Sequence, residues 1–354
     1  MAKQRIPWFD NMKGILIFLM VFGHLIETYR DSYFSAHYLY NVIYSFHMPL
    51  FILISGYFFR PNRIDRIVQV LSVFVIWQLI NGVFQKLIND NEIVSFSSDS
   101  RIMDIFDPYW AMWFLLGIAV WSAITPYVLR LRYPLLFALG LAIWISYVDD
   151  VTKWFSLRKL INFYPYFLIG YYLANKNIVM SLKKRAHSWK QPFRWGAIAI
   201  VLAYFGSALF LTKKGGFTEL LFMSKSYDYF DWSFLKGGTI QLILYGAITI
   251  LSIALMLLVP QEKKLAFFNK LGVYSLFIYM IHTNIVRLFR KFETELLTLH
   301  IALALVICLL FAAAICWLVT RQPVLNFFKP LIQPKMRWSL KQVNDHSKQK
   351  EVAS

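Results

Sequence analysis

The chain has 354 residues, of which 58% are hydrophobic, 18% aromatic and only 16% charged. Because soluble proteins carry about a quarter charged residues, this composition excludes an ordinary soluble domain and indicates an integral membrane protein. Its 37 Lys and Arg against 19 Asp and Glu give a net charge of +18, which we assign to loops on the cytoplasmic side of a membrane rather than to nucleic-acid binding.

Ten apolar segments follow one another along the chain, each long enough to cross a hydrocarbon core of about 30 Å. The predicted fold class is therefore an all-α integral membrane protein with about ten transmembrane helices. The segment at 133–149 is short and begins close to Pro134. We predict spans at residues 11–29, 39–59, 67–88, 109–129, 133–149, 158–174, 194–212, 237–259, 271–290 and 300–320.

The loops between these segments alternate in charge. With the N-terminus inside, the predicted cytoplasmic loops hold most of the Lys and Arg residues, and the predicted outer loops hold most of the acidic ones. This distribution follows the positive-inside rule and predicts that both termini are cytoplasmic. The basic N-terminus is not predicted to be a cleaved signal peptide, since no small-residue cleavage site follows it.

One membrane domain is predicted over residues 1–330, followed by a basic tail over 331–354. The tail has no pattern that would bury a core, so we expect it to lie disordered along the anionic inner leaflet. Two long outer segments are predicted, a Gly-, Tyr- and Trp-rich one at 213–236 and an acidic one at 89–108. The acidic segment carries Asp90, Glu92, Asp99, Asp104 and Asp107.

The first span carries a polar stripe on an otherwise apolar helix. Lys13 and His24 are eleven positions apart, which places them within about 20° of one helix face and about 16 Å apart along the axis. Asp10 and Glu27 lie one turn outside them on the same side. Ionisable residues at such depth usually face a bundle interior or a wet cavity and mark a functional site.

Three histidines on three predicted spans, His24, His47 and His282, lie at a similar depth. Each one alone is also compatible with a buried imidazole that bonds a neighbouring hydroxyl or carbonyl group. His24 differs because Glu27 is placed to hold its tautomer and raise its basicity, as in a general base or nucleophile. Three imidazoles and a carboxylate also suit zinc, but no clustered spacing supports a metal site, and no metal is expected.

The first cytoplasmic loop carries Arg60, Arg63 and Arg66 at three-residue spacing. Guanidinium groups bind phosphates in a bidentate manner, and the alternative is ordinary positive-inside anchoring. Near the outer ends of the spans, Trp113 and Tyr164 belong to clusters of aromatic residues. One interpretation of these clusters is an aromatic belt at the membrane interface. The other is a surface on which a sugar ring stacks, and Trp113 fits both because it lies one turn deeper than a belt residue needs to.

These residues form a pattern that resembles the membrane acyltransferase-3 family. Lys13 followed by ten residues and His24 resembles the family's Arg/Lys-x10-His motif. The run SFHMPLFILISGYFF at 45–59 resembles its second-span signature, and Arg63-Ile-Asp-Arg66 resembles its Arg-x-x-Arg loop motif.

Later segments extend this resemblance to about residue 320. WAMWFL at 110–115 and YSLFIYMIH at 274–282 are similar to corresponding segments of the family, and the fucose 4-O-acetylase-like branch is the most similar. In contrast to some members, we expect no fused extracytoplasmic esterase-type domain that completes the transfer. Either the helices perform the whole reaction, or a separate partner completes it.

The resemblance implies an O-acyltransferase, in the first place an O-acetyltransferase, of the bacterial cell membrane. It implies cytoplasmic acyl-CoA, in the first place acetyl-CoA, as co-substrate, although some relatives use succinyl groups. The acceptor would be a hydroxyl group of a surface glycan such as an exopolysaccharide, or of its lipid-linked precursor, with separate glycan-assembly proteins as further partners. The coenzyme phosphates would rest on Lys13, Arg60, Arg63 and Arg66, and its pantetheine arm would run along the stripe to His24.

Two mechanisms fit this resemblance. His24, oriented by Glu27, deprotonates the acceptor hydroxyl, or His24 itself takes the acyl group as an acyl-imidazole and passes it on. His47, His282 or a tyrosine such as Tyr164 would stabilise the oxyanion. The alternative function is a polytopic transporter or flippase of a glycan or small polar substrate, although the sequence shows no inverted repeat or paired interrupted helices.

Overall fold

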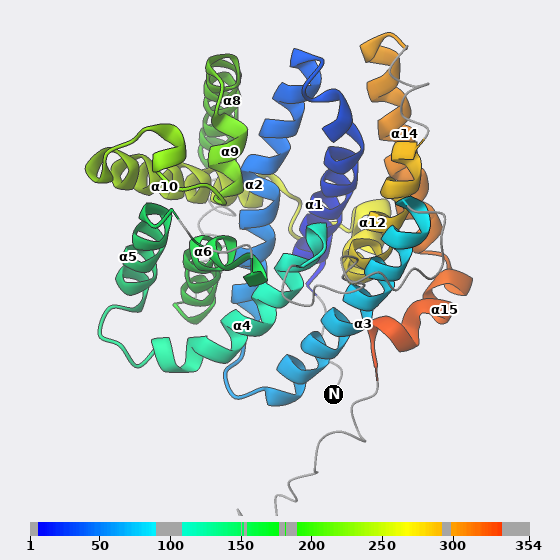
Figure 1. The fold of residues 1–354 in the computed structure, drawn as a ribbon, viewed down its shortest axis with the longest axis horizontal. Coiled ribbons are helices and arrows are strands. Elements are labelled where there is room, and N and C mark those ends of the chain that lie inside the picture. Colours follow the sequence, from blue (N-terminus) through cyan, green and yellow to red (C-terminus); the bar gives the residue numbers. More distant parts are fainter. Residues whose placement is uncertain are drawn as a thin grey trace, which may run out of the picture.

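The computed structural model describes residues 6–89, 108–149, 151, 154–176, 181, 190–291 and 299–334. Within these ranges the chain is helical and contains no strand, so the predicted all-α fold class is confirmed. The bundle in Figure 1 is built mainly from α1 (Pro7–Ile26), α2 (Phe34–Phe58), α3 (Ile64–Asn89), α4 (Trp113–Val128), α5 (Pro134–Tyr147), α6 (Leu157–Asn175), α8 (Lys190–Lys214), α10 (Phe234–Leu258), α12 (Ser275–Lys291) and α14 (Ile301–Val319).

These ten helices coincide with the ten predicted apolar segments. Among the described residues, seven helices are long and apolar enough to cross a membrane, and they lie at Pro7–Tyr29, Phe34–Phe58, Ile64–Ile88, Trp110–Val128, Pro192–Lys214, Phe234–Leu258 and Ile301–Val319. The pair α11 (Ala266–Val273) and α12, bent by 85°, raises this number to eight if it forms one span, and α5 is a shorter apolar helix. The protein is therefore a multi-pass membrane protein, whereas the count of ten and the side of the termini stay predictions.

In the part of the chain that the structure describes, three further helices lie mainly outside the predicted spans. They are α9 (Phe217–Phe222) in the outer segment, α11 before the ninth predicted span, and α15 (Gln322–Ile332), which crosses the predicted boundary at residue 330. The acidic residues from Asp90 to Asp107 lie outside the described residues, as do residues 335–354 of the predicted tail.

Helix α1 runs through the middle of the bundle and positions the polar stripe. It packs against α2, α11, α12 and α14, and Figure 1 shows it between α2 on one side and α12 and α14 on the other. Most of its side chains are buried. A helix that is apolar on nearly every face is stable only when surrounded by other helices or lipid. Of the stripe, Asp10 and His24 are buried, and Lys13 and Glu27 are partly exposed.

Close contact between α1 and α11 fixes the inner end of the stripe. A Cβ atom at Gly272 would lie 1.8 Å from the carbonyl oxygen of Asp10, so only glycine permits this approach. The buried Asn11 side chain donates to the carbonyl oxygens of Pro260 at 3.2 Å and Lys263 at 2.8 Å. It also accepts from the amide of Leu265 at 3.1 Å. These bonds hold the loop before α11 against α1. Helix α12 follows α11 directly and is therefore positioned relative to α1 as well.

Helices α2 and α6 make the second close contact of the bundle. A Cβ atom at Gly56 would lie 2.0 Å from the carbonyl oxygen of Phe167, and one at Gly170 would lie 1.9 Å from that of Leu53. Small residues allow membrane helices to pack at this distance. The contact keeps α6 close to the helix that carries His47.

We therefore predict that Gly170→Ala destabilises the protein by about 1–3 kcal/mol, the usual cost of overpacking. The melting temperature of the purified protein in detergent would report the change. Gly140→Ala is the matched control, because Gly140 also lies in an apolar helix, but a Cβ atom there would have no neighbouring atom within 4 Å. Equal melting temperatures for the two variants would contradict the packing argument.

Candidate active site

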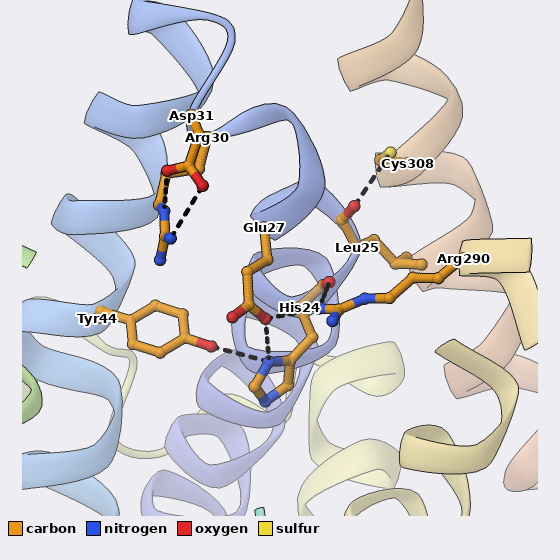
Figure 2. A network of polar contacts seen from close by, with 8 residues as sticks. All are labelled: His24, Leu25, Glu27, Arg30, Asp31, Tyr44, Arg290 and Cys308. Carbon is orange, nitrogen blue, oxygen red and sulfur yellow. Dashed lines mark hydrogen bonds and ion pairs between the residues drawn. The ribbon is translucent and has the colours of Figure 1, made fainter. Parts of the chain in front are cut away.

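His24 lies in the last turn of α1 and is only 6% exposed. Its Nδ1 atom is 2.8 Å from the Tyr44 hydroxyl on α2 and 3.5 Å from Oε2 of Glu27. A carboxylate only accepts hydrogen bonds, so Glu27 favours the tautomer that carries its proton on Nδ1. In Figure 2 these partners approach one edge of the ring, and the second ring nitrogen points away from them. Nε2 is then the nitrogen with a lone pair available for chemistry.

Glu27 is itself held by an arginine that sequence reasoning missed. The guanidinium of Arg290, near the end of α12, donates to Oε2 of Glu27 at 2.6 Å and to the carbonyl oxygen of His24 at 3.2 Å. It also lies 4.7 Å from the centre of the Trp110 ring, which in turn is 4.3 Å from the His24 ring. The only sequence signal for Arg290 was an ionisable residue two turns after His282.

The structure brings the three predicted histidines together. The ring of His282 stacks on that of His24 at 5.5 Å, and the ring of His47 lies 4.6 Å from that of Tyr44. Nδ1 of His47 is 2.8 Å from the Ile43 carbonyl oxygen, and Nδ1 of His282 is 2.9 Å from that of Ile278.

Because a carbonyl oxygen only accepts, each of these two histidines carries its proton on Nδ1. In the neutral ring Nε2 is then an acceptor, so His47 or His282 would donate to an oxyanion only as an imidazolium. Across the described ranges, no group of three or more His, Cys, Asp or Glu side chains is arranged to hold a metal ion.

A cavity of about 180 Å³ lies beside His24. We call it the outer cavity, and the one beside Lys13 the inner cavity, after the predicted topology. Aromatic side chains dominate its wall, and a single lysine, Lys159, contributes its ammonium group 5.6 Å from the centre of the Trp113 ring. Trp113, one of the predicted site residues, packs on Phe163 at 5.1 Å. The predicted residues that line this cavity are His24, Glu27, His47 and Trp113.

Tyr164 does not line this cavity. Its side chain is buried, and its hydroxyl group lies 3.1 Å from Oγ1 of Thr125 on α4. Tyr44 and Trp110 take the positions beside His24 instead. Sequence reasoning did not find Tyr44, because nothing local to the second span distinguishes it from the other tyrosines of that helix.

An inner cavity of about 270 Å³ collects the predicted cations. Lys13, Arg60, Arg63 and Arg66 all line it. Arg63 donates two hydrogen bonds to the carboxylate of Asp65, at 3.0 and 2.8 Å, which raise the pKa of its guanidinium. Lys13 pairs with Asp10 at 2.8 Å. Four cations with two carboxylate partners give this cavity a net positive charge.

The two cavities lie along the same helices. On α2, Met48 lines the outer cavity and Ile54 the inner one, and on α6, Phe163 and Phe167 do the same. Between the cavities, the ring of Phe114 packs on that of Phe51 at 6.2 Å and on that of Tyr279 at 5.6 Å. Helix α1 joins the two cavities, with Lys13 at the inner one and His24 at the outer one.

Comparison with known proteins gives a consistent result. A family model described as an acyltransferase domain matches residues 6–321, a range that includes every candidate site residue. The nodulation protein NolL of Sinorhizobium fredii (strain NBRC 101917 / NGR234) is 28% identical over 195 residues, which are 49% of this chain and 50% of NolL. NolL of Mesorhizobium japonicum (strain LMG 29417 / CECT 9101 / MAFF 303099) is 28% identical over 186 residues, 47% of each chain. This chain thus spans about half the length of these relatives, and no solved structure is significantly similar to it.

Proposed function

The chain belongs to the acyltransferase family whose model matches residues 6–321, and from this premise we propose that it moves an acyl group from cytoplasmic acyl-CoA to a hydroxyl group of a surface glycan or its lipid-linked precursor. The acyl group is proposed to be acetyl, and the location the bacterial cytoplasmic membrane. One observation carries this proposal: a cationic cavity and a histidine-bearing aromatic cavity lie along one set of helices.

The inner cavity is the proposed binding site for the donor. Coenzyme A carries several phosphate oxygens, and Arg60, Arg63 and Arg66 can bind them through charge-assisted hydrogen bonds. Positive-inside anchoring explains basic residues at this face in general, but it does not require four of them to converge on one cavity. Asp10 and Asp65, which now pair with Lys13 and Arg63, would give up these partners to phosphate.

The pantetheine arm is proposed to reach His24 along α1. Lys13 and His24 are separated by about 16 Å of helix rise, which an extended pantetheine arm can cover. On α2 and α4, Phe51 and Phe114 fall in sequence between residues that line the outer cavity and residues that line the inner one, and their rings pack on each other. Their apolar surroundings would then exclude water from the reacting thioester, which strengthens each charge interaction at His24.

The outer cavity is the proposed binding site for the acceptor. Its aromatic wall and few polar groups are typical of small-molecule sites, and the ring of Trp113 offers a flat apolar face to a sugar. A lipid-linked or surface glycan would present one of its hydroxyl groups to His24 there. The acceptor is proposed from this chemistry alone and not from the two nodulation proteins.

In the proposed reaction, Nε2 of His24 accepts the proton of the acceptor hydroxyl while the oxygen attacks the thioester carbonyl carbon. The carbon–sulfur bond then breaks, and the coenzyme thiolate leaves and takes up a proton. Glu27 stabilises the imidazolium that forms on His24. In the second mechanism, Nε2 attacks the thioester carbonyl carbon, the carbon–sulfur bond breaks, and the coenzyme thiolate leaves an acyl-imidazole on His24. The hydroxyl oxygen then attacks this acyl carbon, the bond to Nε2 breaks, and the hydroxyl proton neutralises the thiolate.

We predict that His24→Asn lowers acyl transfer by about 10²–10⁴-fold, the usual contribution of a general base. Free thiol released from acetyl-CoA by membrane vesicles of producing cells would measure it. His300→Asn is the matched control, because His300 is exposed and caps α14, a position that asparagine also fills well. Full activity of the His24 variant would exclude both mechanisms. Labelled acetyl-CoA without acceptor separates the two: an acyl label that becomes bound to His24 would favour the second mechanism.

We predict that Arg63→Gln combined with Arg66→Gln raises the apparent KM for acetyl-CoA by about tenfold or more, because each charged hydrogen bond contributes about 1.5–3 kcal/mol. The same vesicle assay at varied acetyl-CoA concentration reports this value. Arg130→Gln combined with Arg132→Gln removes two cations of the neighbouring predicted cytoplasmic loop that do not line the cavity. If both pairs of substitutions changed the apparent KM equally, the arginine loop would serve membrane topology and not donor binding.

A further inference from the structure

Arg290 connects three parts of the candidate active site. One of its terminal nitrogens donates both to the Glu27 carboxylate, at 2.6 Å, and to the His24 carbonyl oxygen, at 3.2 Å. Its guanidinium lies over the ring of Trp110 at 4.7 Å. The side chain therefore spans from α12 to the end of α1, as Figure 2 shows.

The contacts of Arg290 lie where α1 loses its regular geometry. The α-helix ends at Ile26, and Glu27 begins the 3-10 turn η1 (Glu27–Tyr29). A carboxylate at this point is not held in place by helix geometry alone. Two other arginines lie nearby. Arg30 pairs with Asp31 through two hydrogen bonds of 2.8 and 3.2 Å, which lower the pKa of the Asp31 carboxyl group. The guanidinium of Arg287 lies over the rings of Tyr109 and Trp110, at 6.0 and 5.8 Å from their centres. Among the described arginines, Arg290 is the one whose guanidinium bonds the Glu27 carboxylate.

The position of that carboxylate affects His24 directly. The same oxygen of Glu27 that accepts from Arg290 lies 3.5 Å from Nδ1 of His24. The other groups that contact His24 are the Tyr44 hydroxyl from α2 and the stacked ring of His282 from α12. His47, whose ring packs on Tyr44, lines the same cavity. None of these is an anion, so among them only Glu27 can stabilise a positive charge on His24. Trp110, packed between Arg290 and His24, limits rotation of the imidazole.

We propose that Arg290 is a positioning residue for the transfer reaction, which fixes Glu27 on the Nδ1 edge of His24 so that Nε2 faces the reacting groups. This inference rests on the proposed acyltransferase function. Arg290 acts through Glu27 and does not touch the donor site, which is lined by Lys13 and the arginine loop at the inner cavity. It therefore affects the rate of the chemical step and not the affinity for the donor.

The test is a double-mutant cycle in the vesicle assay. Arg290→Gln is expected to lower kcat by tenfold or more and to leave the apparent KM for acetyl-CoA unchanged. If Arg290 acts through Glu27, the double variant Glu27→Gln with Arg290→Gln is no slower than Glu27→Gln alone, because residues that act as a unit are not additive. Losses that multiply in the double variant would overturn the proposal, because they would show a role independent of Glu27.

Two further variants keep the test decisive. Lys291→Gln removes the exposed neighbouring cation and is expected to leave kcat unchanged. Arg290→Lys keeps the charge but not the planar guanidinium that bonds Glu27 and the His24 carbonyl together, so we expect an intermediate kcat. Should Arg290→Gln not fold, a wild-type kcat for Arg290→Lys would overturn the proposal. If the unmodified protein showed no acyl transfer in this assay, the result would instead contradict the proposed function itself.

Discussion

A carboxylate inside an apolar helical bundle must be paired with a cation, since an unpaired charge there is costly. Glu27 meets this requirement through Arg290, at 2.6 Å, and lies 3.5 Å from His24. The ion pair places the Glu27 carboxylate beside Nδ1 of His24, while Nε2 of the same ring points away from Glu27 and Tyr44. Helices α1, α2 and α12 meet around His24, because each of them contributes a group that contacts the ring or its carboxylate.

The packing of the bundle supports the same arrangement. Contact between Gly272 and the backbone at Asp10 holds α11 against α1, so that α12 rises from the inner end of α1 and brings His282 and Arg290 to its outer half. The close contact of α2 and α6 at Gly56 and Gly170 sets the opposite wall. Two cavities therefore remain along one set of helices, one cationic and one aromatic, and the proposed reaction uses the first for the donor and the second for the acceptor.

The sequence predicted what periodicity and composition within one segment can reveal. It predicted the all-α fold class and the family, which are confirmed. It also singled out Lys13 and the arginine loop, which line one cavity in the structure. It missed Arg290 and Tyr44, because contacts between helices depend on how the helices pack and not on spacing along the chain. It also missed α9 and α11, which are too short to show a clear apolar period. Tyr164, named for its place in an aromatic cluster near the predicted outer ends of the spans, bonds Thr125 and does not line the cavity beside His24. The sequence does not define how a helix is rotated about its axis.

The proposed function is the transfer of acyl groups to a glycan through His24. Its most direct test is mass spectrometry of surface glycans from three strains, which make the unmodified protein, make His24→Asn at the same membrane level, or lack the gene. We predict that the mass increment of an acetyl group is present in the first strain and absent from the other two. Identical glycan spectra from all three strains would contradict the account, and an increment that persists with His24→Asn would exclude His24 as the reacting group.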